Sequence, residues 1–169
     1  MGFEPNLLNR CKVGFSGTRE GMSTPQFKAF RDLVFEWSGD IAEFHHGACV
    51  GADADAAAIV SVAPWDVFKA KIKMIARPGN MPRMVSQVAI NLSDLVLPSK
   101  GTLARNKDIV NACTVLVACP KTTNPNERSG TWSTIRYAIK TGVQVVVISP
   151  TGATCIITNK QPEAEDDAK

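Results

Sequence analysis

The 169-residue chain has no hydrophobic run that approaches the ~20 residues needed to span a bilayer. Its opening segment, MGFEPNLLNR, lacks the apolar core of a secretion signal. We therefore expect a cytoplasmic protein that makes no contact with a membrane.

Several nucleotide-binding and catalytic motifs are also missing. There is no GxxxxGK[ST] loop, which argues against ATP hydrolysis of the P-loop type. GFSGTRE (14–20) does not match the GxGxxG fingerprint, and no acidic residue ends the second predicted strand, so NAD-type redox chemistry is poorly supported. No GxSxG elbow is present. These absences predict a protein without a resident cofactor.

Cysteine and histidine are too sparse to indicate a metal centre. The five cysteines are odd in number and include no CxxC pair, and the chain has two histidines, His45 and His46. Most of the cysteines fall in or beside apolar segments, where cysteine behaves as a small hydrophobe. We expect reduced, buried thiols and no metal site.

What the chain does have is the composition of an ordinary globular protein. It is 44% hydrophobic and 21% charged, and its formal net charge of +3 argues neither for nor against nucleic acid. The length suits one domain, which we assign to 1–158. Residues 159–169 are highly charged, and we expect them to form a disordered tail.

Short β-rich apolar runs alternate with helical patterns along the chain. The predicted strands are 11–17, 41–47, 71–76, 113–119 and 143–149, and the predicted helices are 24–38, 52–63, 102–112 and 131–142. Residues 77–101 predict a loop followed by a helix or an irregular crossover, and 151–160 could add a short final strand. The candidate N-caps are Thr24 for the helix 24–38, Gly51 or Asp53 for 52–63, and Thr102 for 102–112.

This alternation determines the expected fold. The strand at 113–119 is apolar on both faces, as a central strand must be when helices cover both sides of a parallel sheet. Right-handed crossovers then give a doubly wound, Rossmann-like α/β fold, a three-layer sandwich.

Four polar loops fall at the carboxyl ends of the strands, where such sheets bind ligands. They are SGTR (16–19), HHGACVGAD (45–53), the helix start with Thr102, Arg105 and Asn106, and RSGT (128–131). Glycine permits close backbone approach, helix amino ends attract anions, and Ser, Thr and Arg donate to phosphate. Together the loops predict a phosphate-bearing ligand.

Each of these loops also has a purely structural interpretation. Gly17 and Gly47 can simply end strands, Asp53 can cap its helix, and Arg105 can be a solvated charge. Ser129 and Thr131 can likewise serve only as capping residues. One of the two histidines could touch the ligand while the other packs or faces solvent.

Taken together, these segments resemble the SLOG superfamily, which joins DNA-processing protein A, the Lonely Guy phosphoribohydrolases and small nucleotide-binding relatives. GFSGTRE resembles its turn after the first strand, and HGACVGADADAAA (46–58) resembles its GGAxGxDxxA pattern. ARNKDIVNACTVLVACP (104–120) resembles the stretch that carries the family's Arg, and RSGTWSTIRYAIKTGVQVVVIS (128–149) resembles the RSG[ST] run of the DNA-processing branch. The resemblance spans about 12–149.

The resemblance implies a nucleotide or nucleotide-derived ligand, such as an ADP-ribose-type signal, held by a sensor or sequestering protein. The ligand-binding residues expected on this basis are Ser16, Gly17, Thr18, Arg19, Gly47, Ala48, Gly51, Asp53, Arg105, Asn106, Arg128, Ser129, Gly130, Thr131 and Thr134. The resemblance also implies a homo-oligomer, to which Trp37, Trp65 and Trp132 would contribute.

Two alternatives stay open. The first is an N-glycosidic hydrolase of nucleoside 5′-monophosphates, with Arg105 and Asp53 as candidate catalytic residues. Thr134 stands where the Lonely Guy enzymes have a Glu, so Asp53, Asp55 or Glu127 would have to supply the carboxylate. The second is a protein that binds single-stranded DNA.

Overall fold

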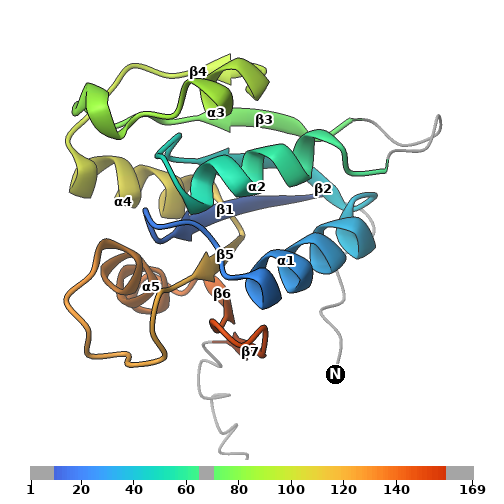
Figure 1. The fold of residues 1–169 in the computed structure, drawn as a ribbon, viewed down its shortest axis with the longest axis vertical. Helices are drawn as coiled ribbons and strands as arrows, with labels where there is room; N and C mark the ends of the chain where they lie inside the picture. Colours follow the sequence, from blue (N-terminus) through green and yellow to red (C-terminus); the bar gives the residue numbers. More distant parts are fainter. Residues whose placement is uncertain (1–9, 65–70, 159–169) are drawn as a thin grey trace, which may run out of the picture.

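The computed structural model describes residues 10–64 and 71–158, which form a single seven-stranded sheet with helices on both faces (Figure 1). The strand order is β4-β3-β2-β1-β5-β6-β7, and only β7 is antiparallel to its neighbour. The strands are β1 (Cys11–Gly17), β2 (Ile41–His46), β3 (Lys73–Ala76), β4 (Leu95–Val96), β5 (Val115–Cys119), β6 (Gln144–Ile148) and β7 (Thr154–Ile157). The helices are α1 (Thr24–Trp37), α2 (Ala52–Ser61), α3 (Gln87–Leu92), α4 (Thr102–Ala112) and α5 (Gly130–Lys140), with a 3-10 turn η1 (Pro82–Met84).

The Rossmann-like fold predicted from the sequence is confirmed, with every predicted strand and helix present. The ambiguous stretch 77–101 contains η1, α3 and the short edge strand β4, and the segment after 150 contributes β7. The tail 159–169 lies outside the described residues. None of the described helices has the length and apolar character needed to cross a bilayer.

Of the predicted helix caps, Gly51 is confirmed for α2, while Thr24 and Thr102 need correction. Ser23, and not Thr24, caps α1, because its side chain accepts the N–H of Gln26 while the Gln26 side chain accepts the N–H of Ser23. Gly101 precedes α4, so Thr102 is its first helical residue. Gly51 precedes α2, and the Asp53 carboxylate turns back to the preceding loop.

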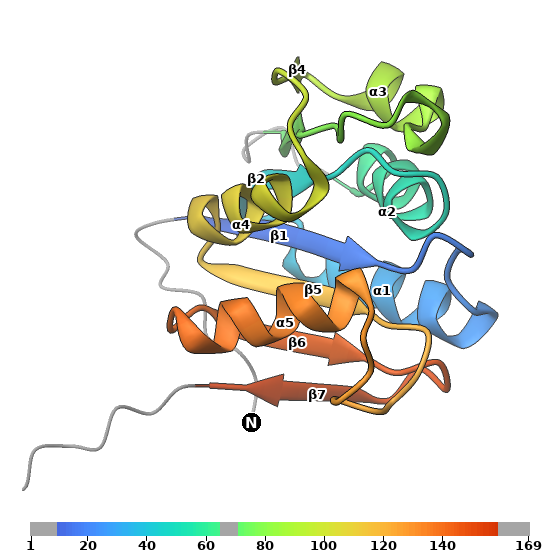
Figure 2. The ribbon, with the colours of Figure 1, turned by 90° about the vertical axis from the view of Figure 1, so that its left-hand side faces the viewer.

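Two hydrophobic layers hold the helices on the sheet. On one face Phe15, Phe30 and Phe44 pack together, with the Phe15 and Phe30 ring centroids 5.1 Å apart, beneath α1 and α2. On the other face α4 and α5 bury a second cluster that includes Trp132 and Ile135 (Figure 2). The fully buried phenylalanines and Ile135 each contribute about 1.5–3 kcal/mol.

Trp37 and Trp132, two of the three tryptophans named in the oligomer prediction, are buried. Trp37 and Trp132 are 8% and 7% exposed within the single chain, and the Trp132 indole N–H donates to the carbonyl of Thr122. Trp65 lies outside the described residues. Oligomerisation therefore stays a prediction that these two side chains do not support.

The crossovers divide the sheet at β1. The chain moves from β1 towards β4 with α1, α2 and α3 on one face, then returns to β5 and β6 with α4 and α5 on the other face (Figures 1 and 2). The loops that leave β1 and β5 consequently diverge to opposite faces. This is the switch point of a doubly wound sheet, where a ligand crevice is expected.

Candidate functional site

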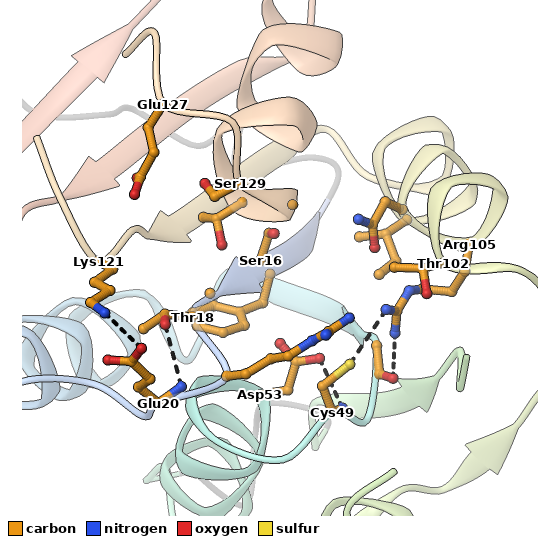
Figure 3. Close-up of a pocket in the computed structure, with 18 residues that line it drawn as sticks. Ser16, Thr18, Glu20, Cys49, Asp53, Thr102, Arg105, Lys121, Glu127 and Ser129 are labelled. Atoms are coloured by element: carbon orange, nitrogen blue, oxygen red, sulfur yellow. Dashed lines mark hydrogen bonds and ion pairs between the residues drawn. The ribbon is translucent and has the colours of Figure 1, made fainter. Parts of the chain in front are cut away.

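A cavity of about 320 Å³ lies at the carboxyl ends of β1 and β5, at the switch point (Figure 3). All four polar loops singled out in the sequence contribute to its wall. It is lined by Phe15, Ser16, Gly17, Thr18, Arg19, Glu20, Gly47, Cys49, Asp53, Thr102, Arg105, Asn106, Ile109, Lys121, Glu127, Ser129, Gly130 and Thr131.

The loop after β1 forms one wall and is held tightly at its base. A Cβ at Gly17 would lie 2.5 Å from the Cβ of Ala52, so only glycine lets α2 approach the end of the strand. The carbonyl of Thr18 accepts the N–H of Ala52, and the Thr18 N–H donates to the carbonyl of Cys119. These bonds join the end of β1 to both α2 and β5.

The loop between β2 and α2 makes a tight turn beneath the cavity. Ala48 adopts the left-handed conformation at φ 51°, and Gly51 lies at φ 89° against the carbonyl of Arg19. The buried Asp53 carboxylate accepts the N–H of Cys49 at 3.0 Å and so fixes the turn. Burial raises the pKa of Asp53, although the charge of Arg105 and the backbone N–H groups of the turn oppose that rise.

Arg105 is a buried cation at the end of the cavity towards α4. Its side chain is 4% exposed, and it donates through Nη1 to the carbonyl of Gly47 at 2.5 Å and through Nη2 to Sγ of Cys49 at 3.4 Å. Its Nε has no hydrogen-bond partner, and the described residues include no carboxylate that forms an ion pair with it. The buried Asp53 carboxylate is near enough to offset part of the Arg105 charge, but the Nε donor without a partner still favours an anionic ligand.

The amino end of α5 supplies a second feature suited to an anion. Ser129 caps the helix by accepting the N–H of Trp132, and its carbonyl accepts the N–H of Ser133. Within the described ranges, the N–H groups of Gly130 and Thr131 have no such partner, and both residues line the cavity. Ser16 projects from β1 beneath this helix end (Figure 3).

The mouth of the cavity, on the side away from Arg105, carries the acidic side chains of Glu20 and Glu127 (Figure 3). Lys121, just beyond β5, forms an ion pair with Glu20 at 2.7 Å, which joins the loops after β5 and β1. The Glu20 carboxylate raises the pKa of Lys121 by hydrogen bonding and by its charge. Glu127 extends from the loop before α5 towards Lys121 (Figure 3), and one of its oxygens accepts the hydroxyl of Thr122.

The two histidines support the floor of the site without lining it. His46 is fully buried, with Nδ1 accepting the N–H of Ala48 and Nε2 bonded to the hydroxyl of Ser93. His45 bonds through Nε2 to Glu43 and accepts a long bond from Arg77. Neither reaches the cavity, so the suggestion that one histidine could touch the ligand finds no support here.

Most of the residues expected from the sequence meet in this cavity. They are Ser16, Gly17, Thr18, Arg19, Gly47, Asp53, Arg105, Asn106, Ser129, Gly130 and Thr131. Ala48, Gly51 and Arg128 do not line it: Ala48 and Gly51 shape the turn, and Arg128 is exposed on the loop before α5.

Thr134 also lies outside the cavity. Its hydroxyl donates to the carbonyl of Gly130 within α5, and its side chain lines a separate groove between α4 and α5. Thr134 is one turn beyond Thr131, about 4.5 Å farther from the helix end along the axis. That displacement separates it from the site.

Sequence reasoning did not assign Phe15, Glu20, Cys49, Ile109 and Lys121 to the site. Glu20 directly follows the SGTR loop, so extending that loop by one residue would have included it, whereas Lys121 lies two residues beyond the predicted strand 113–119 and outside the RSGT loop. Phe15 and Ile109 carry only a core pattern. The described residues contain no group of three or more His, Cys, Asp or Glu side chains arranged for a metal ion.

The sheet order and the switch-point cavity define the chain as a Rossmann-like α/β protein with a polar ligand-sized cavity at the carboxyl edge of its sheet. The structure is similar to that of the molybdenum cofactor binding protein from the phototrophic bacterium Rippkaea orientalis. The TM-score is 0.60 and the identity 20%, over 84% of this chain and 78% of that one.

A second similar structure is that of TM1055, with a TM-score of 0.53 and 13% identity over 80% of this chain and 72% of that one. At these identities the likeness shows a shared fold. The sequence matches no model of a known protein family and no curated protein.

Proposed function

We propose that this protein binds a nucleotide or a nucleotide-derived ligand at the switch-point cavity, as a sensor or a sequestering protein. The observation that carries the proposal is the buried guanidinium of Arg105, whose Nε has no hydrogen-bond partner, in the same cavity as the helix-end N–H groups of Gly130 and Thr131. A phosphate would interact with both: the helix end supplies backbone donors, and Arg105 supplies the compensating charge.

The resemblance to the SLOG superfamily supports this proposal because its separate motifs converge. Gly47, Asp53, Arg105 and the segment 129–131 belong to three motifs far apart in the sequence, and all line one cavity. A neighbour of the same fold is named for binding the molybdenum cofactor, which agrees with a small-molecule ligand. Membership of the superfamily is part of the proposal.

The size of the cavity favours a mononucleotide. Its volume of about 320 Å³ lies near the lower limit of ligand cavities, which range over ~300–1,000 Å³. A longer ligand of the ADP-ribose type would extend beyond it, past Asn106, which also lines the groove between α4 and α5.

Hydrolysis of the N-glycosidic bond of a nucleoside 5′-monophosphate is a second candidate function. It draws support from Glu20 and Glu127, two carboxylates at the cavity that are not buried. Asp53 is a weaker candidate, since burial raises its pKa and its Oδ2 already accepts a backbone N–H. Release of free base from a nucleoside monophosphate panel would establish hydrolysis and overturn the binding-only proposal.

Binding of single-stranded DNA draws less support. Arg128, the residue whose substitution tests this alternative, is exposed and lies outside the cavity. Affinity for oligonucleotides that falls steeply with salt, and that is lost in Arg128→Ala, would favour it.

A ligand-screen melt tests the main proposal. A nucleotide present at 100 times its Kd should raise Tm by about 5–10 °C, because that occupancy adds about 2.7 kcal/mol to the stability of a chain of this size. A panel of nucleoside mono- and diphosphates and ADP-ribose, with inorganic phosphate as reference, covers the expected ligands. Absence of any shift across the panel would overturn the proposal.

A further inference from the structure

Three carboxylates line the cavity, and they are in different states. Asp53 is buried, and its Oδ2 accepts the N–H of Cys49. Glu20 is 66% exposed and paired with Lys121. Glu127 is half-buried: its Oε2 accepts the hydroxyl of Thr122, while its Oε1 accepts no hydrogen bond from any described residue.

The loop that carries Glu127 is held in place by hydrogen bonds within the chain. Arg136 of α5 donates through Nη1 to the carbonyls of Pro125, at 2.8 Å, and of Glu127, at 3.3 Å. The Glu127 N–H donates to the carbonyl of Asn124, and the Trp132 indole anchors Thr122. The carboxylate is therefore presented in a defined position, which lowers the entropy lost on binding.

The position of Glu127 also restricts what it can bind. Figure 3 shows its carboxylate pointing towards Lys121, on the side of the α5 helix end away from Arg105. A carboxylate accepts hydrogen bonds and repels phosphate, so a phosphate would occupy the Arg105 side. The part of the ligand that reaches Glu127 must instead offer donors, and the two adjacent hydroxyls of a ribose suit this requirement.

We propose that Glu127 selects ligands whose ribose 2′ and 3′ hydroxyls are both free, so that the site binds ribonucleoside 5′-phosphates in preference to 2′-deoxyribonucleotides and to nucleotides phosphorylated at the 2′ or 3′ position. This inference rests on the proposed nucleotide-binding function. Glu127 accepts from the ribose hydroxyls, and Lys121 offsets part of the negative charge at the cavity mouth.

Calorimetric titration of the full chain tests the inference with the four ribonucleoside 5′-monophosphates and their 2′-deoxy counterparts. A hydrogen bond to a charged group predicts that the preferred ribonucleotide binds about 10-fold to 100-fold more tightly than its 2′-deoxy form. In Glu127→Gln, which keeps the shape and an acceptor for Thr122, this preference should fall to about threefold, with affinity for the 2′-deoxy form nearly unchanged.

The matched control is Glu36→Gln, since Glu36 is exposed on α1 and does not line the cavity. It should keep the full preference. Equal affinity of the wild type for ribo and 2′-deoxy forms, or a preference that survives in Glu127→Gln, would overturn the inference while leaving nucleotide binding intact. No binding of any nucleotide would instead overturn the proposed function and this inference with it.

Discussion

Replacing Arg105 with methionine should separate ligand binding from folding. Methionine keeps an unbranched apolar stem and removes the guanidinium, whose donors reach the carbonyls of Gly47 and Arg77 and the thiol of Cys49. Loss of these bonds, and of the charge that favours the ionised Asp53 carboxylate, destabilises the fold, while removal of a buried cation without an ion-pair partner stabilises it. The two contributions are of similar size, so we expect the free energy of unfolding to change by less than about 2 kcal/mol.

Arg105→Met should weaken ligand binding, and by more than it changes the free energy of unfolding. On the proposed function, a phosphate bound to the wild type would accept hydrogen bonds from a charged donor that is already buried, so little desolvation would remain on binding. A contribution of about 3 kcal/mol corresponds to a Kd that rises ~100-fold in Arg105→Met.

Isothermal titration with the nucleotide that gives the largest thermal shift measures this change. Arg31→Met is the matched control, because Arg31 is exposed on α1 and paired with Asp32. It should bind like the wild type. A Kd for Arg105→Met within threefold of the wild type would refute the assignment of Arg105 to the phosphate.

Three further predictions concern the surroundings of the site. In Gly47→Ala the added Cβ would lie 1.9 Å from Nη1 of Arg105, so the guanidinium must move and calorimetry should show affinity reduced at least tenfold. Burial lowers the pKa of His46 from 6.5 to about 4, with smaller contributions from neighbouring positive charges, so protonation favours the unfolded chain. Stability present above pH 6.5 should therefore fall by about 3 kcal/mol as the pH drops towards 4, as measured by urea unfolding. Cys155 is exposed and should react first with a thiol reagent, whereas Cys49 should react slowly and more slowly still when nucleotide fills the cavity.

Each of these predictions has its own control. A Cβ at Gly101 meets no atom within 4 Å, so Gly101→Ala should bind normally, and unchanged affinity in Gly47→Ala would contradict the close approach. His46→Asn should flatten the pH dependence of unfolding between pH 4 and 6.5, and an unaltered slope would exclude His46 as its source. If bound nucleotide does not slow the labelling of Cys49, the ligand lies outside this cavity.

The layered fold was predictable because its signals are local. Strands such as 113–119 are apolar on both faces, and that pattern alone requires helices on both sides. The strand-to-helix loops were predictable as a group for the same reason, since parallel strands bring their carboxyl ends to one edge. The helix caps were harder to predict. Ser23, and not Thr24, caps α1 because it forms reciprocal hydrogen bonds with Gln26, and residue type alone does not distinguish these two neighbouring candidates.

By itself, the sequence determined the class of fold and the loops that surround the cavity, because periodicity and chain order specify both. Only the tertiary structure decided which side chains face one another across it. Arg105 reaches the carbonyl of Gly47 and has no carboxylate at ion-pair distance among the described residues, and Thr134 lies outside the cavity because it is one turn too far from the helix end. Glu127 and Lys121 lie at the mouth because the loop after β5 folds back towards β1. Such relations depend on long-range packing, which no local pattern encodes.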